Sequence, residues 1–198
     1  MAIWGDNYYK EFYPNIRYVP NRYIPNKHLS VEERQLFHNV DNNRTIETIR
    51  YLDDGINPNI KNDRGYPLLL LSMERRRDDV TNLLINHPQI DLFACNEYGD
   101  NALHYAVDNN RIDLVKLLLN KGLDVNKKGQ GGDTPLHNAV VYNRLSMVKL
   151  LLDHGADLSI TNDHNQTPLD IAVEEEYSKI VDYITSYERI DIKEPCCD

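Results

Sequence analysis

The sequence repeats itself every 33 residues, and this period constrains the fold more than any other feature. Residues 99–104 read Gly-Asp-Asn-Ala-Leu-His, residues 132–137 read Gly-Asp-Thr-Pro-Leu-His, and residues 165–170 read Asn-Gln-Thr-Pro-Leu-Asp. An alanine follows seven residues after each start, and a valine follows after sixteen. One such unit is too short to form its own core, so the chain is expected to bury apolar surface by stacking neighbouring units.

Each unit is predicted to form two short antiparallel helices and a turn. Thr134 and Pro135 mark the start of a first helix, because threonine caps a free N–H and proline is tolerated at the first helical position. Gly122 ends a second helix, where a left-handed residue is favoured. Residues 114–119 are apolar almost all round, which indicates a helix buried between neighbours.

The motif Thr-Pro-Leu-His-x-Ala, complete from Thr134 to Ala139, resembles the ankyrin repeat. The resemblance covers residues 29–187 as five repeats, at about 29–61, 62–95, 96–128, 129–161 and 162–187. The repeat at 62–95 departs from the pattern, since it lacks the Thr and His and its step to Gly99 is 34 residues. The resemblance implies an all-α solenoid of antiparallel helix pairs joined by β-hairpin-like turns.

The two ends of the chain differ from the repeats. Residues 1–28 are rich in Tyr and Pro and contain the tandem segments Arg17–Asn21 and Arg22–Asn26, in which each proline favours extended backbone. Two interpretations stay open for this segment: a strap over the first repeat, or a docking peptide that orders on a partner. Residues 188–198 are expected to be an acidic, flexible tail.

Charge and cysteine content limit the kinds of partner and the cellular compartment that we expect. The net charge of −9 argues against nucleic acid as a partner, and no apolar run is long enough to span a membrane. The three cysteines, Cys95, Cys196 and Cys197, form no disulfide framework and favour the cytoplasm. An excess of Asn, Ile, Lys and Tyr suggests an A+T-rich genome, so the cytosol of a host cell stays open if the source is an intracellular parasite.

No catalytic or cofactor-binding pattern is recognisable, so the chain is predicted not to be an enzyme. His104 and His137 fill the same repeat position, on the order of 10 Å apart, which is too far for one metal ion. The resemblance implies that they bond backbone and neighbouring repeats. Asn126, with Leu118 and the preceding Asp-Val, resembles the pattern that an asparagine hydroxylase accepts in ankyrin repeats. The alternative is that Asn126 only closes a turn.

The resemblance implies that a partner contacts the turn tips and the exposed side of the first helices. We therefore expect a monomeric, non-catalytic protein–protein interaction module that binds a protein through its concave face. The alternative is an adaptor, targeting subunit or pathogen effector that recruits machinery through its N-terminal segment. Tyrosines at 66, 98 and 142 are the expected anchors, because tyrosine is common among residues that dominate binding energy. The candidate contact residues are Arg64, Tyr66, Arg75, Tyr98, Asp100, Asp108, Asp133, Tyr142, His164, Glu174 and Glu175.

Overall fold

A computed structural model describes residues 28–191, with side chains for residues 28–187. This part of the chain folds into five antiparallel helix pairs, one for each predicted repeat. The pairs are α2 (Val31–Asp41) with α3 (Thr45–Asp53), α4 (Leu68–Glu74) with α5 (Asp78–Ile85), α6 (Ala102–Asp108) with α7 (Ile112–Asn120), α8 (Pro135–Val141) with α9 (Leu145–Asp153), and α10 (Pro168–Glu174) with α11 (Ser178–Asp191). The predicted all-α solenoid is confirmed for the described residues, whose backbone forms no β-strand beyond the isolated bridge between Lys61 and Pro67.

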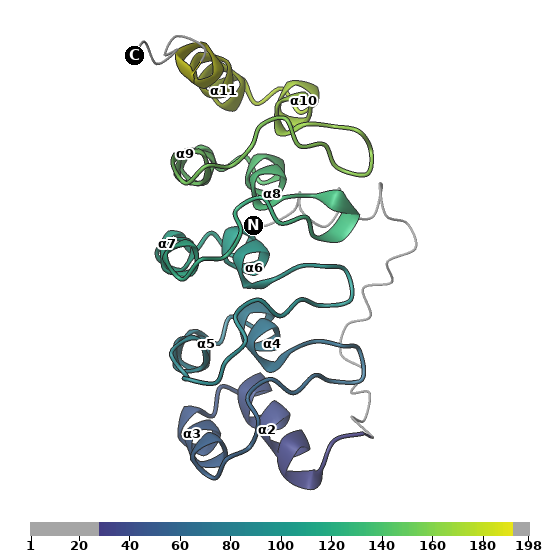
Figure 1. Ribbon diagram of the computed structural model, residues 1–198, viewed down its shortest axis with the longest axis vertical. Coiled ribbons are helices and arrows are strands. Elements are labelled where there is room, and N and C mark those ends of the chain that lie inside the picture. Colours follow the sequence, from purple (N-terminus) through teal and green to yellow (C-terminus); the bar gives the residue numbers. More distant parts are fainter. Residues whose placement is uncertain (1–27, 192–198) are drawn as a thin grey trace, which may run out of the picture.

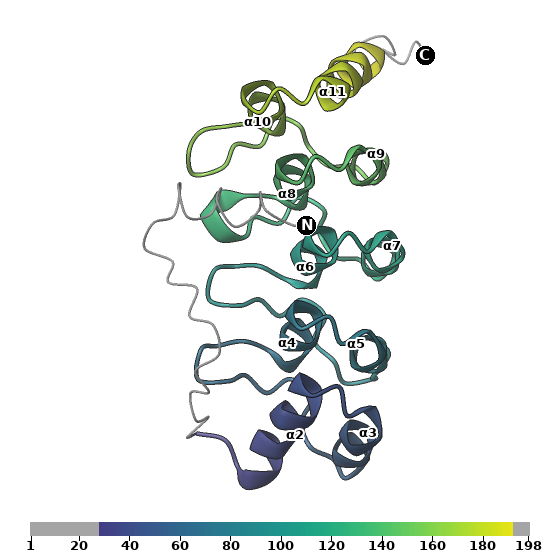
Figure 2. The same ribbon diagram turned by 180° about the vertical axis from the view of Figure 1, so that it is seen from behind.

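The pairs stack into parallel columns (Figure 1). The first helix of each pair lies in one column, and the second helices form another beside it, as the reverse view also shows (Figure 2). Four long connections join the pairs and project from the first-helix column, away from the second helices. They comprise residues 54–67, 86–101, 121–134 and 154–167, and the third contains the 3-10 turn η1 (Gln130–Gly132). We call the surface formed by the connection tips and the ends of the first helices the inner face.

Two of the first helices, α8 and α10, begin after a threonine cap, as the sequence predicts for Thr134. Thr167 Oγ1 accepts a hydrogen bond from the N–H of Asp170 (3.2 Å), and the Asp170 carboxylate accepts one from the N–H of Thr167 (2.8 Å). This reciprocal box satisfies donors that have no partner inside the helix. His137 replaces the acid in the preceding repeat, where its Nδ1 accepts a hydrogen bond from the N–H of Thr134 (3.1 Å).

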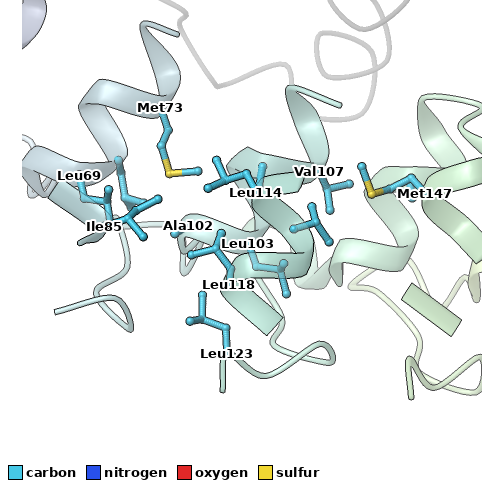
Figure 3. Close-up of a cluster of buried hydrophobic side chains, with 14 of the residues drawn as sticks. Leu69, Met73, Ile85, Ala102, Leu103, Val107, Leu114, Leu118, Leu123 and Met147 are labelled. Atoms are coloured by element: carbon cyan, nitrogen blue, oxygen red, sulfur yellow. The ribbon is translucent and has the colours of Figure 1, made fainter. Parts of the chain in front are cut away.

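The core runs continuously from pair to pair. Leu118 and Leu151 are fully buried, as the periodicity predicts, and so are the small residues Ala106 and Ala139, which let neighbouring first helices approach. Figure 3 shows this packing across consecutive repeats, with Met147 beside Val107. Stacking therefore supplies the buried area that no single pair can provide.

Side chains at the start of the second helices complete the preceding pair. Arg77 Nε donates to the carbonyl oxygen of Asp41 (2.9 Å), and Arg144 Nη2 donates to that of Asp108 (3.0 Å). Tyr177 takes the same place in the last pair, where its hydroxyl donates across 3.4 Å to a carbonyl near the end of α8. The last carbonyls of a helix have no intrahelical donor and carry partial negative charge, so a cation from the next repeat stabilises them.

The two ends depart from the sequence expectation or lie beyond the description. Helix α11 continues to Asp191, four residues past the predicted boundary at 187. The strap and docking-peptide interpretations concern residues 1–28, of which the structure describes His28 alone. Most of the predicted tail, residues 192–198, also lies outside the described residues. His28 bonds the first connection through Asp63 Oδ1 (2.6 Å) and the carbonyl of Lys61 (2.9 Å). Among the described helices, none has the length and apolar character needed to cross a bilayer.

Candidate functional site

The connection tips are built around one asparagine. Asn96 Oδ1 accepts hydrogen bonds from the backbone N–H groups of Tyr98 (2.9 Å) and Asp100 (3.0 Å), which closes the tip of the second connection. Asn62 and Asn162 close the first and fourth tips in the same way. Each closed tip presents to solvent the side chain two residues after its asparagine. These side chains are Arg64, Tyr98 and His164.

The third connection lacks this asparagine, and a carboxylate from the preceding connection accepts the backbone hydrogen bond instead. Gly129 occupies the asparagine position, and Asp100 Oδ1 from the preceding connection accepts the N–H of Gln130 (2.8 Å). A Cβ atom on residue 129 would lie 2.2 Å from that oxygen and 2.7 Å from His104 Nε2, so only glycine fits. The carboxylate of Asp100, a candidate contact residue, is therefore used to join two repeats.

Asp133 also lies inside the structure, which corrects its assignment to the partner surface. Its residue is 3% exposed, and its carboxylate accepts a hydrogen bond from Asn162 Nδ2 (2.9 Å) of the next repeat. Burial raises the pKa of this carboxyl to about 6. Asp133 therefore joins repeats rather than facing solvent.

Asp108 is half-buried at the end of α6. Its carboxylate accepts a hydrogen bond from Asn138 Nδ2 (2.8 Å) on the next first helix. Burial raises the pKa of the Asp108 carboxyl to about 7, although the bond from Asn138 and the charge of Arg144 act in the opposite direction. Part of this residue reaches the inner face, and its protonation state is sensitive to pH near neutrality.

The three candidate tyrosines lie at different depths. Tyr98 is 41% exposed at the second tip. Tyr66 is half-buried and packs against the core, and burial raises its pKa. Tyr142 is half-buried at the end of α8, with the Arg144 guanidinium carbon 4.5 Å from its ring centroid. Of the three, Tyr98 offers the most accessible ring.

The inner face is basic near one end and acidic near the other. Arg75 is half-exposed and its Nε lies 3.0 Å from the carboxylate of Asp41. At the opposite end, Glu174 and Glu175 are exposed where α10 finishes, and Glu174 accepts a hydrogen bond from Gln166 Nε2 (2.6 Å). Together with Arg64, these residues make the face basic near one end and acidic near the other.

The histidines inside the stack are buried among the helices. His137 is fully buried, its Nε2 donates to the carbonyl of Gln166 (3.1 Å), and burial lowers its pKa to about 4. His104 occupies the equivalent place one repeat earlier, and burial lowers its pKa as well. In the described part of the chain, no three His, Cys, Asp or Glu side chains gather in an arrangement that could hold a metal ion.

Asn126 connects two repeats through its carboxamide. Its Nδ2 donates to the carbonyl of Gly155 (3.2 Å), and its Oδ1 accepts the N–H of Asp157 (2.8 Å). Hydroxylation of Asn126 stays a prediction. The equivalent position one repeat earlier is Phe93, which is 61% exposed and which the sequence analysis missed. Aligning the repeats on residue 126 would have revealed it, because asparagine recurs at position 59.

Comparisons with known proteins agree with this architecture. A family profile described as ankyrin repeats (3 copies) matches residues 36–129, and a second, ankyrin repeats (many copies), matches residues 118–172. The two matches together extend over more than half of the 198 residues, so the chain belongs to the ankyrin-repeat family.

Relatives resemble only part of this chain. It is 36% identical over 85 residues to alpha-latrocrustotoxin-Lt1a of Latrodectus tredecimguttatus, covering 42% of this chain and 6% of the toxin. It is 31% identical over 87 residues to an ankyrin repeat-containing protein of Schizosaccharomyces pombe, covering 42% and 37% of the two chains. A putative ankyrin repeat protein of Rickettsia felis is 39% identical over 72 residues, covering 36% and 24%. The chain thus spans well under half the length of these relatives.

Membership of the family indicates a protein–protein interaction module. Ankyrin repeats are generally a non-catalytic fold for interaction, and they suggest a protein partner. The specificity of such a module lies in surface side chains that the framework does not use.

Proposed function

We propose that this chain binds a protein partner through its inner face, with Tyr98 as the main anchor. The exposure of Tyr98 at a tip held rigid by Asn96 is the observation that carries the proposal. A rigid, exposed aromatic side chain provides contact area at low conformational cost. Arg64 lies close enough to interact electrostatically with Tyr98, so a basic and aromatic cluster forms at the first two tips.

Charge at the other end of the face orients the partner. Glu174 and Glu175 lie at the end of α10, three repeats away from Arg64. A partner with an acidic segment near Tyr98 and a basic segment near α10 complements this polarity, and charge complementarity favours one docking direction.

A photo-crosslinking amino acid at position 98 tests the proposal. With extract of the source cell, we expect it to capture one partner, and the purified partner should then bind the unmodified chain. The matched control places the same amino acid at Lys116, an exposed residue of α7 in the second-helix column. Capture of the same partner equally from both positions, or from position 116 alone, would show that the inner face is not the binding surface.

A further inference from the structure

Side-chain hydrogen bonds, which we call ties, join neighbouring repeats in a regular pattern, and one interface lacks them. Each long connection can be tied to the next by two side chains. At the interface of the first and second repeats, Asn59 Nδ2 donates to the carbonyl of Gln89 (2.7 Å) and Asn59 Oδ1 accepts the N–H of Asp91 (2.7 Å). Two residues later, Lys61 Nζ donates to the carbonyl of Cys95 (3.4 Å).

The interface of the third and fourth repeats reproduces this arrangement. Asn126 stands in the place of Asn59 and makes the same two bonds to the fourth connection. Lys128 stands in the place of Lys61, and its Nζ donates to the carbonyl of Thr161 (2.6 Å). The two ties therefore belong to the repeat pattern.

Between the second and third repeats, both tying residues are replaced. Phe93 stands where the asparagine should be, and a phenyl ring can neither donate to Gly122 nor accept from Asp124, the equivalent partners in the third connection. Cys95 stands where the lysine should be, and its Sγ donates to the carbonyl of Phe93 (3.4 Å) within its own connection. Neither side chain reaches across this interface.

The far end of the same interface is altered too. Arg111 occupies the place from which Arg77 and Arg144 bond the end of the preceding first helix, but it pairs with the carboxylate of Asp78 instead. Asn109 Nδ2 donates to the carbonyl of Met73 (2.9 Å). A pocket of about 150 Å³ lies here between the two repeats, lined by Met73 and Leu114 among others. Figure 3 shows Met73 directed from its repeat towards Leu114 of the next.

On the inner face, the second and third repeats are in contact. Tyr66 packs against the core close to Asn96 and Tyr105 of the third repeat. The chain also gains one residue before this interface, because Gly65 and Gly99 are 34 positions apart while Gly99 and Gly132 are 33 apart. The interface is thus held at the inner face by Tyr66 and at the far end by Asn109 and Arg111, whereas both ties from positions 93 and 95 to the third connection are missing.

We propose that the array bends at the interface between the second and third repeats, where two stiffer bodies, residues 29–95 and 96–187, meet. The missing ties at Phe93 and Cys95 and the pocket between Met73 and Leu114 are the juxtaposition that defines this hinge. The proposal is independent of the identity of any partner.

Thiol labelling of the full-length chain tests the hinge. Val40, Met73 and Val107 occupy equivalent places in successive first helices and are 0%, 3% and 0% exposed. Each is replaced singly by cysteine in a background in which the three natural cysteines are serine. Under native conditions we expect the thiol at 73 to react about tenfold faster than those at 40 and 107, because a locally opened interface exposes it without global unfolding.

Restoring the missing tie provides the decisive comparison. Phe93→Asn should slow labelling at position 73 towards the rates at 40 and 107, because it adds two hydrogen bonds across the interface. Conversely, Asn126→Phe should accelerate labelling at position 107. Equal rates at all three positions would overturn the hinge. Equal, fast labelling rates at positions 40 and 73 would also overturn it, because they mean that the first two repeats unfold. So would a labelling rate at position 73 that Phe93→Asn leaves unchanged, because it means that the reagent enters through the pocket.

Discussion

Replacing Asp108 with asparagine should stabilise the protein, and the gain should grow with pH. The folded-state pKa of Asp108 is about 7, whereas an aspartate in an unfolded chain titrates near a pKa of about 4. Between these values the folded protein holds a proton that the unfolded chain has lost, so this group makes stability fall as pH rises from about 4 to about 7. Above pH 7 the full cost of the buried charge is present.

The size of the gain follows from the pKa difference. About three pKa units at 1.36 kcal/mol each set an upper limit of about 4 kcal/mol. Asp108 is only half-buried, so screening by solvent reduces this figure, and we expect a gain of about 2 kcal/mol at pH 8 and close to zero at pH 4. Asparagine keeps an oxygen that can accept the bond from Asn138, so the packing contact survives.

Urea denaturation followed by circular dichroism at pH 4, 6 and 8 measures this gain. His137, whose pKa burial lowers to about 4, makes total stability rise between about pH 4 and 6.5, but it is present in both proteins and cancels in the difference. The control is Asp113→Asn, which makes the same charge change at an exposed site on α7. An equal gain at pH 4 and pH 8, or a variant less stable than the parent at pH 8, would refute the reasoning.

Three further predictions concern the repeat interfaces and the inner face. Asn126→Ala removes two hydrogen bonds between repeats and should lower the free energy of unfolding by about 2 kcal/mol in urea; no loss would mean that water replaces both bonds fully. Gly129→Ala places a Cβ atom 2.2 Å from Asp100 Oδ1 and should lower the melting temperature by several degrees in calorimetry; an unchanged value would mean that the turn relaxes freely. Tyr98→Ala should leave the melting temperature unchanged and weaken partner binding by more than about 1 kcal/mol in calorimetric titration, and unaltered affinity would remove Tyr98 as an anchor.

The helical framework could be predicted from the sequence because the same residues recur at equivalent positions in successive repeats. Leu118 and Leu151 recur at one spacing, and both are buried because the helices that carry them pack between neighbouring repeats. The caps at Thr134 and Thr167 were predictable for a local reason, since both partners lie within three residues. The end of α11 could not be predicted in this way. No glycine or proline follows directly after the expected boundary at residue 187, and the helix continues to Asp191.

The candidate site could be predicted only in part, because exposure depends on what the next repeat supplies. Asp133 is buried by Asn162, 29 residues later, and the equivalent position holds a tyrosine, an aspartate or a glutamine in the other repeats. A position that varies in this way is typical of a contact surface, so the pattern favoured the wrong interpretation for Asp133. Phe93 differs from this case: aligning the repeats shows that it replaces an asparagine, but the bonds lost by that replacement are known from the contacts of Asn126.

The bonds from the second helices to the preceding pair have a consequence for synthesis on the ribosome. Arg77 follows Asp41 by 36 residues, and Arg144 follows Asp108 by the same interval. The last turn of such a first helix therefore acquires this hydrogen-bond donor from the next repeat only after roughly one further repeat has been translated. Maturation of the array should trail elongation by one unit, and α8 of the fourth pair, whose end is bonded by Tyr177 rather than by an arginine, should wait for the last pair.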